Sequence, residues 1–361
     1  MSGTWGNNIK ISIFGESHGE SIGIVIDGIK PGVEIDFEEI DFEMSRRAPG
    51  KSSLTTARKE SDKPEIVSGY FNGRTTGTPI CALIRNSDTN SKDYSRTKDL
   101  MRPGHADYTG YVKYKGFNDY RGGGQFSGRL TAPIVFCGAV FKQILKREGV
   151  YIAAHVKSIG EVEDLDFNYL ENSIEKNIEL FEKLKYEELP FIDKPKTNLA
   201  KEAIESAKSG LDSVGGVVEC AVLGMKAGVG DPYFDSIEST ISHLMFSVPA
   251  VKGIEFGAGF EVAKMRGSEC NDDFYMDGDC VKTRTNNNGG VLGGISNGMP
   301  IVFRVAVKPT PSIGIEQGSV NINKMEDEQL SVRGRHDPCI IPRIIPVIEA
   351  MSAIAVYDLT R

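Results

Sequence analysis

The feature that most constrains the fold of this chain is a faint internal repeat within its 361 residues. A strand-like run at 22–27 (IGIVID) leads through Gly-Ile-Lys-Pro-Gly-Val into a helix-like run at 37–47. Far along the chain, a strand-like run at 217–223 (VVECAVL) leads through Gly-Met-Lys-Ala-Gly-Val into a helix-like run at 235–246. Because the same elements recur in the same order, the sequence predicts two related halves, about 10–150 and 210–361.

Two more correspondences follow in each half. Gly-Thr-Pro-Ile opens a strand at 80–84, and Gly-Met-Pro-Ile opens one at 301–307. Arginine and proline then precede long helices at 133–147 and 340–356, which are apolar on most sides and are therefore expected to be buried. Chance is an alternative for such short matches, but the common order favours duplication. We expect one domain of α/β (α+β) class over 1–361.

Composition excludes several classes of protein. The chain is 40% hydrophobic and 25% charged, with a net charge of −8 that disfavours general nucleic-acid binding. Residues 1–10 lack the pattern of a signal peptide, and the apolar stretch 340–357 is broken by proline and charge, so we interpret it as a buried helix and not a membrane span. The six cysteines show no CxxC and irregular spacing, which indicates neither zinc nor disulfides. We expect a cytoplasmic protein that binds no metal, nucleic acid or membrane.

Two segments depart from this regular pattern. Residues 85–129 are basic, rich in glycine and without clear periodicity, which is typical of a functional loop region. Residues 160–197 are strongly acidic with few apolar anchors, and we interpret them as a peripheral, solvated helical insertion without chemistry.

Three of the five histidines lie in short motifs that combine Gly with Arg, Ser or Asp. Histidine exchanges protons near neutral pH, glycine lets the backbone approach a ligand, and arginine binds carboxylate and phosphate through a planar fork. Together the motifs predict proton transfer on an anionic substrate. They are Gly15-Glu16-Ser17-His18-Gly19, Arg102-Pro103-Gly104-His105-Ala106-Asp107 and Arg333-Gly334-Arg335-His336-Asp337.

The first motif also matches the G-x-S-x-G nucleophile elbow, which makes a serine hydrolase with Ser17 as nucleophile the alternative function. Its context is weak, because too few residues precede it to build the strands that present such an elbow. The acid and base would have to be residues such as Asp235 and His243, which lie in no supporting motif. A non-catalytic flavin- or anion-binding protein is a third reading.

Several loops are rich in hydrogen-bond donors. The run 122–129 (GGGQFSGR) leads into a helix, where backbone N–H groups bind phosphate or carboxylate, but it lacks the ending of a P-loop. The runs 286–294 and 308–312 flank a strand and could hold a flat cofactor with a phosphate tail. Arg46 and Arg47 end the first helix, where they either cap its dipole or clamp an anion.

Taken together, these motifs resemble those of the chorismate synthase family, in the same order, from residue 5 to the C-terminus. They are FGESHG (14–19), RRAPG (46–50), TTGTPI (75–80), RPGHADYTG (102–110), RGGG (121–124), NNNGGVLGGISNG (286–298), KPTPS (308–312) and GRHDPC (334–339). The resemblance implies a β-α-β sandwich with internal pseudo-two-fold duplication, helices packed between antiparallel sheets, and a homotetramer. It also implies conversion of 5-enolpyruvylshikimate 3-phosphate to chorismate and phosphate by 1,4-elimination, with reduced FMN (FMNH2) and no net redox change, and an association with NADP.

The resemblance carries roles onto matching positions. His18 resembles the acid near the departing phosphate, His105 the residue that supports the reduced flavin, and Asp337 with Ser17 the pair that manages the proton at flavin N5. The expected substrate-binding residues are Arg47, Arg102, Arg129 and Arg335. The expected flavin-binding residues are Gln125, Phe126, Ser127, Ala250, Gly293, Lys308, Pro309, Thr310, Pro311, Ser312 and Arg335.

The chain departs from the family pattern at two places. Many members have Arg-Ser-Ser where this chain has Gln125-Phe126-Ser127, and many have Arg where it has Ser53. These departures leave the contacts of 51–53 and 125–126 open. Because the motifs span almost the whole chain, we expect no reductase domain and therefore an external flavin reductase or reductant.

Overall fold

Two antiparallel sheets enclose a layer of helices in the computed structural model, which describes residues 3–50, 54–55, 60–87, 98–167, 173–332 and 337–361. The first sheet has the order β1 (Thr4–Trp5), β2 (Lys10–Gly15), β3 (Ser21–Asp27), β7 (Ile80–Arg85), β4 (Pro64–Ser68). The second has the order β11 (Val251–Phe256), β16 (Ile301–Val307), β10 (Gly216–Leu223), β8 (Tyr151–Ile159), β9 (Val162–Glu163).

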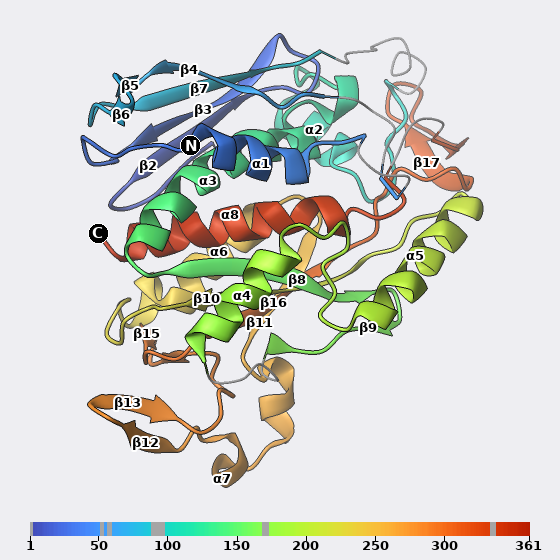
Figure 1. The fold of residues 1–361 in the computed structure, drawn as a ribbon. Coiled ribbons are helices and arrows are strands. Elements are labelled where there is room, and N and C mark those ends of the chain that lie inside the picture. Colours follow the sequence, from blue (N-terminus) through green and yellow to red (C-terminus); the bar gives the residue numbers. More distant parts are fainter. Residues whose placement is uncertain (1–2, 51–53, 56–59, 88–97, 168–172, 333–336) are drawn as a thin grey trace.

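The helices between the sheets carry most of the core (Figure 1). They are α1 (Phe37–Arg47), α3 (Thr131–Arg147), α6 (Ile237–Ser247) and α8 (Ile341–Leu359). Helices α3 and α8 approach so closely that a Cβ atom at Gly138 would overlap Ala350. The alternating isoleucines of β3 (Ile22, Ile24 and Ile26) are fully buried against this layer, as the period of a half-buried strand requires.

The elements expected from the sequence are confirmed. The predicted strands at 22–27, 80–84, 217–223 and 301–307 are β3, β7, β10 and β16. The side chain of Asp36 caps α1 by accepting the N–H groups of Glu38 and Glu39 at 2.9 and 3.2 Å. The two long apolar helices are α3 and α8, and both are buried along nearly their whole length.

The acidic segment is helical, as predicted, but it is not merely solvated. Helices α4 (Ile174–Leu184) and α5 (Lys194–Ser209) pack beside the second sheet (Figure 1). Phe167, Phe181 and Leu184 form a small core with the outward-facing Ala221 and Val302 of that sheet. The few apolar residues of the segment suffice, because they cover the one face of the sheet that the central helices leave open.

The remaining described elements are short. They are α2 (Asp107–Lys113), α7 (Gly267–Cys270), the turns of 3₁₀ helix η2 (Arg121–Phe126), η3 (Gly128–Leu130), η5 (Tyr233–Asp235) and η6 (Gly259–Lys264), and the hairpins β5 (Tyr70–Phe71)–β6 (Arg74–Thr75), β12 (Phe274–Asp277)–β13 (Cys280–Thr283), β14 (Val291–Leu292)–β15 (Ile295–Ser296) and β17 (Gln317–Asn321)–β18 (Glu326–Leu330). One described stretch, Gly128–Arg147, has the length and hydropathy of a membrane span, but 83% of it is buried inside the fold. It is therefore accounted for as a core helix.

Candidate active site

A run of three glycines brings the first two histidine motifs together. Gly122, Gly123 and Gly124 lie in η2 with φ values of 60°, 84° and 53°, a region that favours glycine. A Cβ atom at Gly122 would overlap the His18 ring, and one at Gly123 would lie 3.1 Å from His105 Cε1. The bare glycine backbone thus contacts two histidines that are distant in sequence, and a larger residue would displace one of them.

His105 is held by a carboxylate and a guanidinium. Its Nδ1 lies 2.7 Å from Asp107 Oδ1 and 3.1 Å from Arg102 Nη2. Arg102 also donates Nε and Nη2 to the two oxygens of Asp107 at 2.7 and 2.8 Å. Burial raises the pKa of Asp107, but the bonds from Arg102 and His105 outweigh it and hold that pKa below its usual range. Asp107 therefore stays ionised and orients the His105 ring through the bond to its Nδ1.

This arrangement bears on the predicted role of Arg102. Two nitrogens of the Arg102 guanidinium group donate hydrogen bonds to Asp107. The third, Nη1, lies 3.4 Å from Ser312 Oγ. The structure therefore gives Arg102 a positioning role toward His105, while its part in substrate binding stays a prediction.

Ser17 and His18 are almost fully buried beside the glycine run, with 0% and 7% of their surface exposed. The Ser17 N–H donates to Gly124 O at 3.2 Å. Within the described residues, the Ser17 hydroxyl has no hydrogen-bond partner. A buried polar atom left in this way is a place where a bound ligand can supply the missing partner.

The serine-hydrolase reading finds no support in this geometry. Ser17 is fully buried and does not stand at the exposed tip of a strand–helix turn. Asp235 accepts a hydrogen bond from Asn7, and the His243 ring lies 6.4 Å from that of Trp5. Neither residue is placed to serve Ser17.

Two arginines share one buried carboxylate near the same cavity. Arg47 Nε donates to Asp62 Oδ2 at 3.0 Å, Arg129 Nη1 pairs with Asp62 Oδ1, and Arg129 Nε donates to Asn86 at 2.9 Å. Burial raises the pKa of Asp62, but the two guanidinium groups outweigh it and lower that pKa. Burial, with the nearby charges of Arg343 and Arg129, lowers the pKa of Arg47 to about 10. Asp62 and Arg47 therefore remain charged at neutral pH, and Asp62 fixes the two guanidinium planes.

The C-terminal motif reaches this cluster through Asp337. Its carboxylate accepts a bond from Arg343 Nη1 at 2.6 Å, and Arg343 Nε donates to Arg47 O at 3.1 Å. Asp337 and Ser17 thus contact different groups, and their joint role stays a prediction. Arg335 and Ser53 lie outside the described residues.

A cavity of about 620 Å³ joins these features. Its wall includes most of the predicted site residues, which come from the motifs at both ends and in the middle of the chain. They are Arg47, Arg102, His105, Gln125, Phe126, Ser127, Arg129, Ala250, Lys308, Thr310, Pro311, Ser312 and Asp337. The predicted residues that do not line it are Ser17 and His18, which lie behind Gly122, Pro309, which packs on Gly215, and Gly293, which lies in the turn between β14 and β15.

The wall fits a flat anionic cofactor. The volume of the cavity lies within the usual range of small-molecule sites. Its wall combines apolar residues, such as Val248, Ala250 and Val347, with several cationic side chains, such as those of Arg47 and Arg129. Ala250 has a φ of 76°, a strained conformation for a residue with a side chain, and its carbonyl accepts the Lys308 N–H at 3.0 Å. Such strain is retained where the surrounding structure requires it, as at a ligand site. No cluster of His, Cys, Asp and Glu suited to a metal occurs among the residues described.

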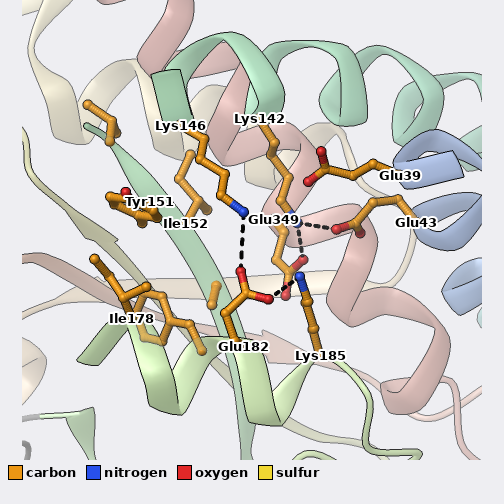
Figure 2. Close-up of a pocket in the computed structure, with 13 residues that line it drawn as sticks. Glu39, Glu43, Lys142, Lys146, Tyr151, Ile152, Ile178, Glu182, Lys185 and Glu349 are labelled. Carbon is orange, nitrogen blue, oxygen red and sulfur yellow. Dashed lines mark hydrogen bonds and ion pairs between the residues drawn. The ribbon is translucent and has the colours of Figure 1, made fainter. Parts of the chain in front are cut away.

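A second, much smaller pocket is lined by Glu43, Lys142 and Glu349, the buried ion cluster to which Arg46 also binds. Arg46 donates to both oxygens of Glu349 at 2.5 and 2.9 Å, and Lys142 lies 2.7 Å from Glu43 and 2.8 Å from Glu349. Figure 2 shows Lys142 pointing from α3 toward both carboxylates. The cations in this pocket already pair with carboxylates, and the pocket volume of about 50 Å³ leaves room for little more than water.

Sequence reasoning missed three residues of the site, Asp62, Asp107 and Arg343. Asp107 lay within a quoted motif, and its spacing of two from His105 was the available signal. Asp62 and Arg343 lie in no motif, so only the tertiary contacts reveal them.

Comparison with known proteins agrees with these motifs. The sequence model of the family described as "Chorismate synthase" matches residues 9–360. Proteins named chorismate synthase from Pyrococcus abyssi and Methanothermobacter thermautotrophicus are 47% and 45% identical. Each alignment covers 98% of this chain, with 96% of the first relative and 92% of the second.

A solved structure gives the same result. "Crystal Structure of Chorismate Synthase" superposes with a TM-score of 0.78 at 32% identity, over 98% of this chain and 92% of that one. The match by sequence and by fold over nearly the whole length shows that the chain belongs to the chorismate synthase family.

Proposed function

We propose that this protein converts 5-enolpyruvylshikimate 3-phosphate to chorismate and phosphate, with reduced FMN as cofactor. The observation that carries the proposal is the glycine run, in which Gly122 contacts His18 and Gly123 contacts His105. This run lies beside a cavity whose lining includes several arginines. The family to which the chain belongs supports the same activity.

The reaction expels phosphate and removes a ring proton, so the protein must stabilise a departing dianion. Arg47 and Arg129 suit this task because Asp62 already fixes their planes, so that little side-chain entropy is lost when they hold an anion. His18, buried beside Gly122, is proposed as the acid that protonates the leaving phosphate oxygen.

The second histidine has a different proposed task. Reduced FMN, when bound, supplies the group that accepts the ring proton. Gln125 to Ser127, Ala250 and the 308–312 loop would hold it, and His105, positioned by Asp107, would lie near its anionic form. Asp337 and Ser17 would hold the proton at flavin N5. The residues of this chain would then not need to supply a separate base for the ring proton.

We also propose that the protein is a cytoplasmic homotetramer that receives reduced FMN from an external reductase or reductant. Large apolar side chains are exposed on η5, η6 and the β12–β13 hairpin, as is typical of surfaces that a partner subunit covers. They include Tyr233, Phe234, Phe260, Phe274 and Met276, each more than half exposed. The association with NADP stays a prediction.

For the architecture, we infer a β-α-β sandwich formed by internal duplication in a single domain. The order β2-β3-β7-β4 in the first sheet parallels the order β8-β10-β16-β11 in the second. The helices α1 and α3 correspond in the same way to α6 and α8, and the segment with α4 and α5 has no counterpart in the first half.

The test is stoichiometry under argon with a limiting amount of chemically reduced FMN. Many chorismate molecules should form for each flavin, because the flavin is returned reduced, and oxidised FMN in air should support almost no turnover. One chorismate per flavin, with oxidised FMN accumulating in step, would show net electron consumption and refute the mechanism. Flavin binding without phosphate release would indicate a non-catalytic binding protein.

A further inference from the structure

Gly110 occupies a position where glycine is costly. It lies in the middle of α2 and is buried, and its φ is that of an ordinary helical residue. Glycine inside a helix costs about 0.5–1 kcal/mol relative to alanine. Backbone conformation does not explain it, so the reason must lie in what packs against it.

The neighbour is the ring of Phe126. A Cβ atom at Gly110 would lie 2.6 Å from Phe126 Cε2 and 3.2 Å from its Cζ, closer than a side chain can approach without displacing the ring. The same ring lies 6.2 Å from the Tyr114 ring, one turn further along the chain. Gln125 Nε2 donates to the Tyr114 hydroxyl at 2.5 Å. The Phe126 ring therefore packs directly against the backbone of α2 at Gly110, with the Tyr114 ring beside it.

This contact joins two walls of the large cavity. Helix α2 begins at Asp107, the carboxylate that holds His105. On the other side, Gln125, Phe126 and Ser127 belong to the donor-rich loop that lines the cavity. A shift of the Phe126 ring would move this loop relative to the His105 cluster.

We propose that Phe126 is a positioning residue whose ring, seated on Gly110, fixes the 125–127 loop relative to His105 and so sets the shape of the flavin site. The inference rests on the proposed use of FMN. The bare backbone at Gly110 also leaves room for the bulky Phe126 at a position where many members of the family have Ser. Neither residue need touch the reacting atoms for the pair to control the site.

The experiment is a double-mutant cycle with Gly110→Ala, Phe126→Ser and the two combined. The measurements are the dissociation constant of FMN, from flavin fluorescence, and the visible spectrum of the bound flavin. Gly110→Ala should weaken FMN binding about ten-fold, because its methyl group displaces the Phe126 ring. Phe126→Ser should weaken FMN binding by a similar factor, because the loop loses the contact between the Phe126 ring and helix α2. In the Phe126→Ser background, Gly110→Ala should change the dissociation constant by less than about two-fold, because the collision is gone.

The control is Val112→Ala, an exposed residue of the same helix, which should leave FMN binding unchanged. Equal effects of Gly110→Ala in both backgrounds, or no effect in the unsubstituted protein, would overturn the inference. If Gly110→Ala alone does not fold, recovery of the fold in the double variant supports the collision, and failure of both contradicts it. An unsubstituted protein that binds no FMN would instead reject the proposed cofactor, so the two ideas fail separately.

Discussion

At the scale of single residues, side chains that are adjacent in sequence contact different groups in the structure. Arg46 and Arg47 both end α1, yet Arg46 enters a buried ion cluster with Glu349 while Arg47 lines the cavity beside Asp62. Successive residues of a helix point about 100° apart, so neighbours in sequence serve different parts of a structure. Arg46 thus pairs with Glu43 and Glu349, whereas Arg47 shares Asp62 with Arg129.

The two histidines at the glycine run give the first prediction. His18→Ala and His105→Ala should each lower turnover by ~10²–10⁴, the usual contribution of a positioned proton-transfer group. Far-UV circular dichroism should show an unchanged fold. Phosphate release under anaerobic conditions measures the effect, and His243→Ala is the control, because that histidine is exposed and lies beside Trp5. Near-normal turnover in both site variants would remove the histidines from the chemistry.

At the scale of elements, packing between α3 and α8 decides how close the two halves lie. Gly138 faces Ala350, and further along the same interface the rings of Phe141 and Tyr357 stack at 4.3 Å. A bare backbone at one point and large rings at another fix the relative position of the two helices.

Gly138→Ala should therefore destabilise the protein by about 1–3 kcal/mol, the typical cost of overpacking a dense core, despite the better helix propensity of alanine. Urea unfolding followed by circular dichroism gives the free energy. Gly318→Ala in β17, where an added Cβ would meet nothing within 4 Å, is the matched control. A stability gain at Gly138 would show that α3 and α8 separate at little cost.

The acidic segment is attached through a buried histidine. His155 lies on the covered face of β8, with Nδ1 3.2 Å from Asp164 and Nε2 3.0 Å from Glu219. Burial lowers the pKa of His155, but the two carboxylates outweigh it and the pKa is raised above its ordinary value. The charged ring therefore stabilises the fold below the unfolded pKa of about 6.5, and this contribution disappears as pH rises through the higher folded pKa.

We expect the stability difference between the unsubstituted protein and His155→Gln to be about 3–5 kcal/mol at pH 6, because the substitution leaves two buried carboxylates without their cation. The difference should shrink as the pH is raised toward 9. Thermal unfolding at a series of pH values measures it. A difference that grows with pH would contradict the assignment of a charged ring.

At the scale of the whole molecule, a buried ion cluster connects elements from both ends of the chain. Glu349 of α8 binds Lys142 of α3 (Figure 2). It also binds Arg46 of α1 and accepts the Ala154 N–H of β8 at 3.1 Å. Burial raises the pKa of Glu349, but the two cations outweigh it and lower it to about 2. The cluster thus stabilises the fold above the ordinary carboxyl pKa and loses this effect as pH falls toward 2.

Lys142→Met should cost about 3–5 kcal/mol, because it leaves Glu43 and Glu349 with too little positive charge in a buried site. Lys146→Met, one turn further along α3, removes only a half-exposed pair with Glu182 and should cost about 0–1 kcal/mol. Urea unfolding at pH 7 compares the two. Equal costs would mean that the buried cluster contributes no more than a surface pair.

The sequence by itself determined the elements and the family. Some features depend only on local spacing, which can be read directly from the sequence. They are the alternating isoleucines in β3, the Asp36 cap of α1 and the apolar character of α3 and α8. The motifs, together with the family resemblance, also predicted thirteen residues that line one cavity.

Only the tertiary structure decided which partners those residues have. Asp62 lies between two arginines and Glu349 pairs with Arg46, and both contacts join residues from different elements or loops, so no periodicity encodes them. The same holds for the acidic segment, whose few apolar residues matter because one face of the second sheet would otherwise meet water. Local spacing fixes which face of an element is apolar, but burial, and with it the pKa and the partner of each charge, depends on what the folded chain places opposite.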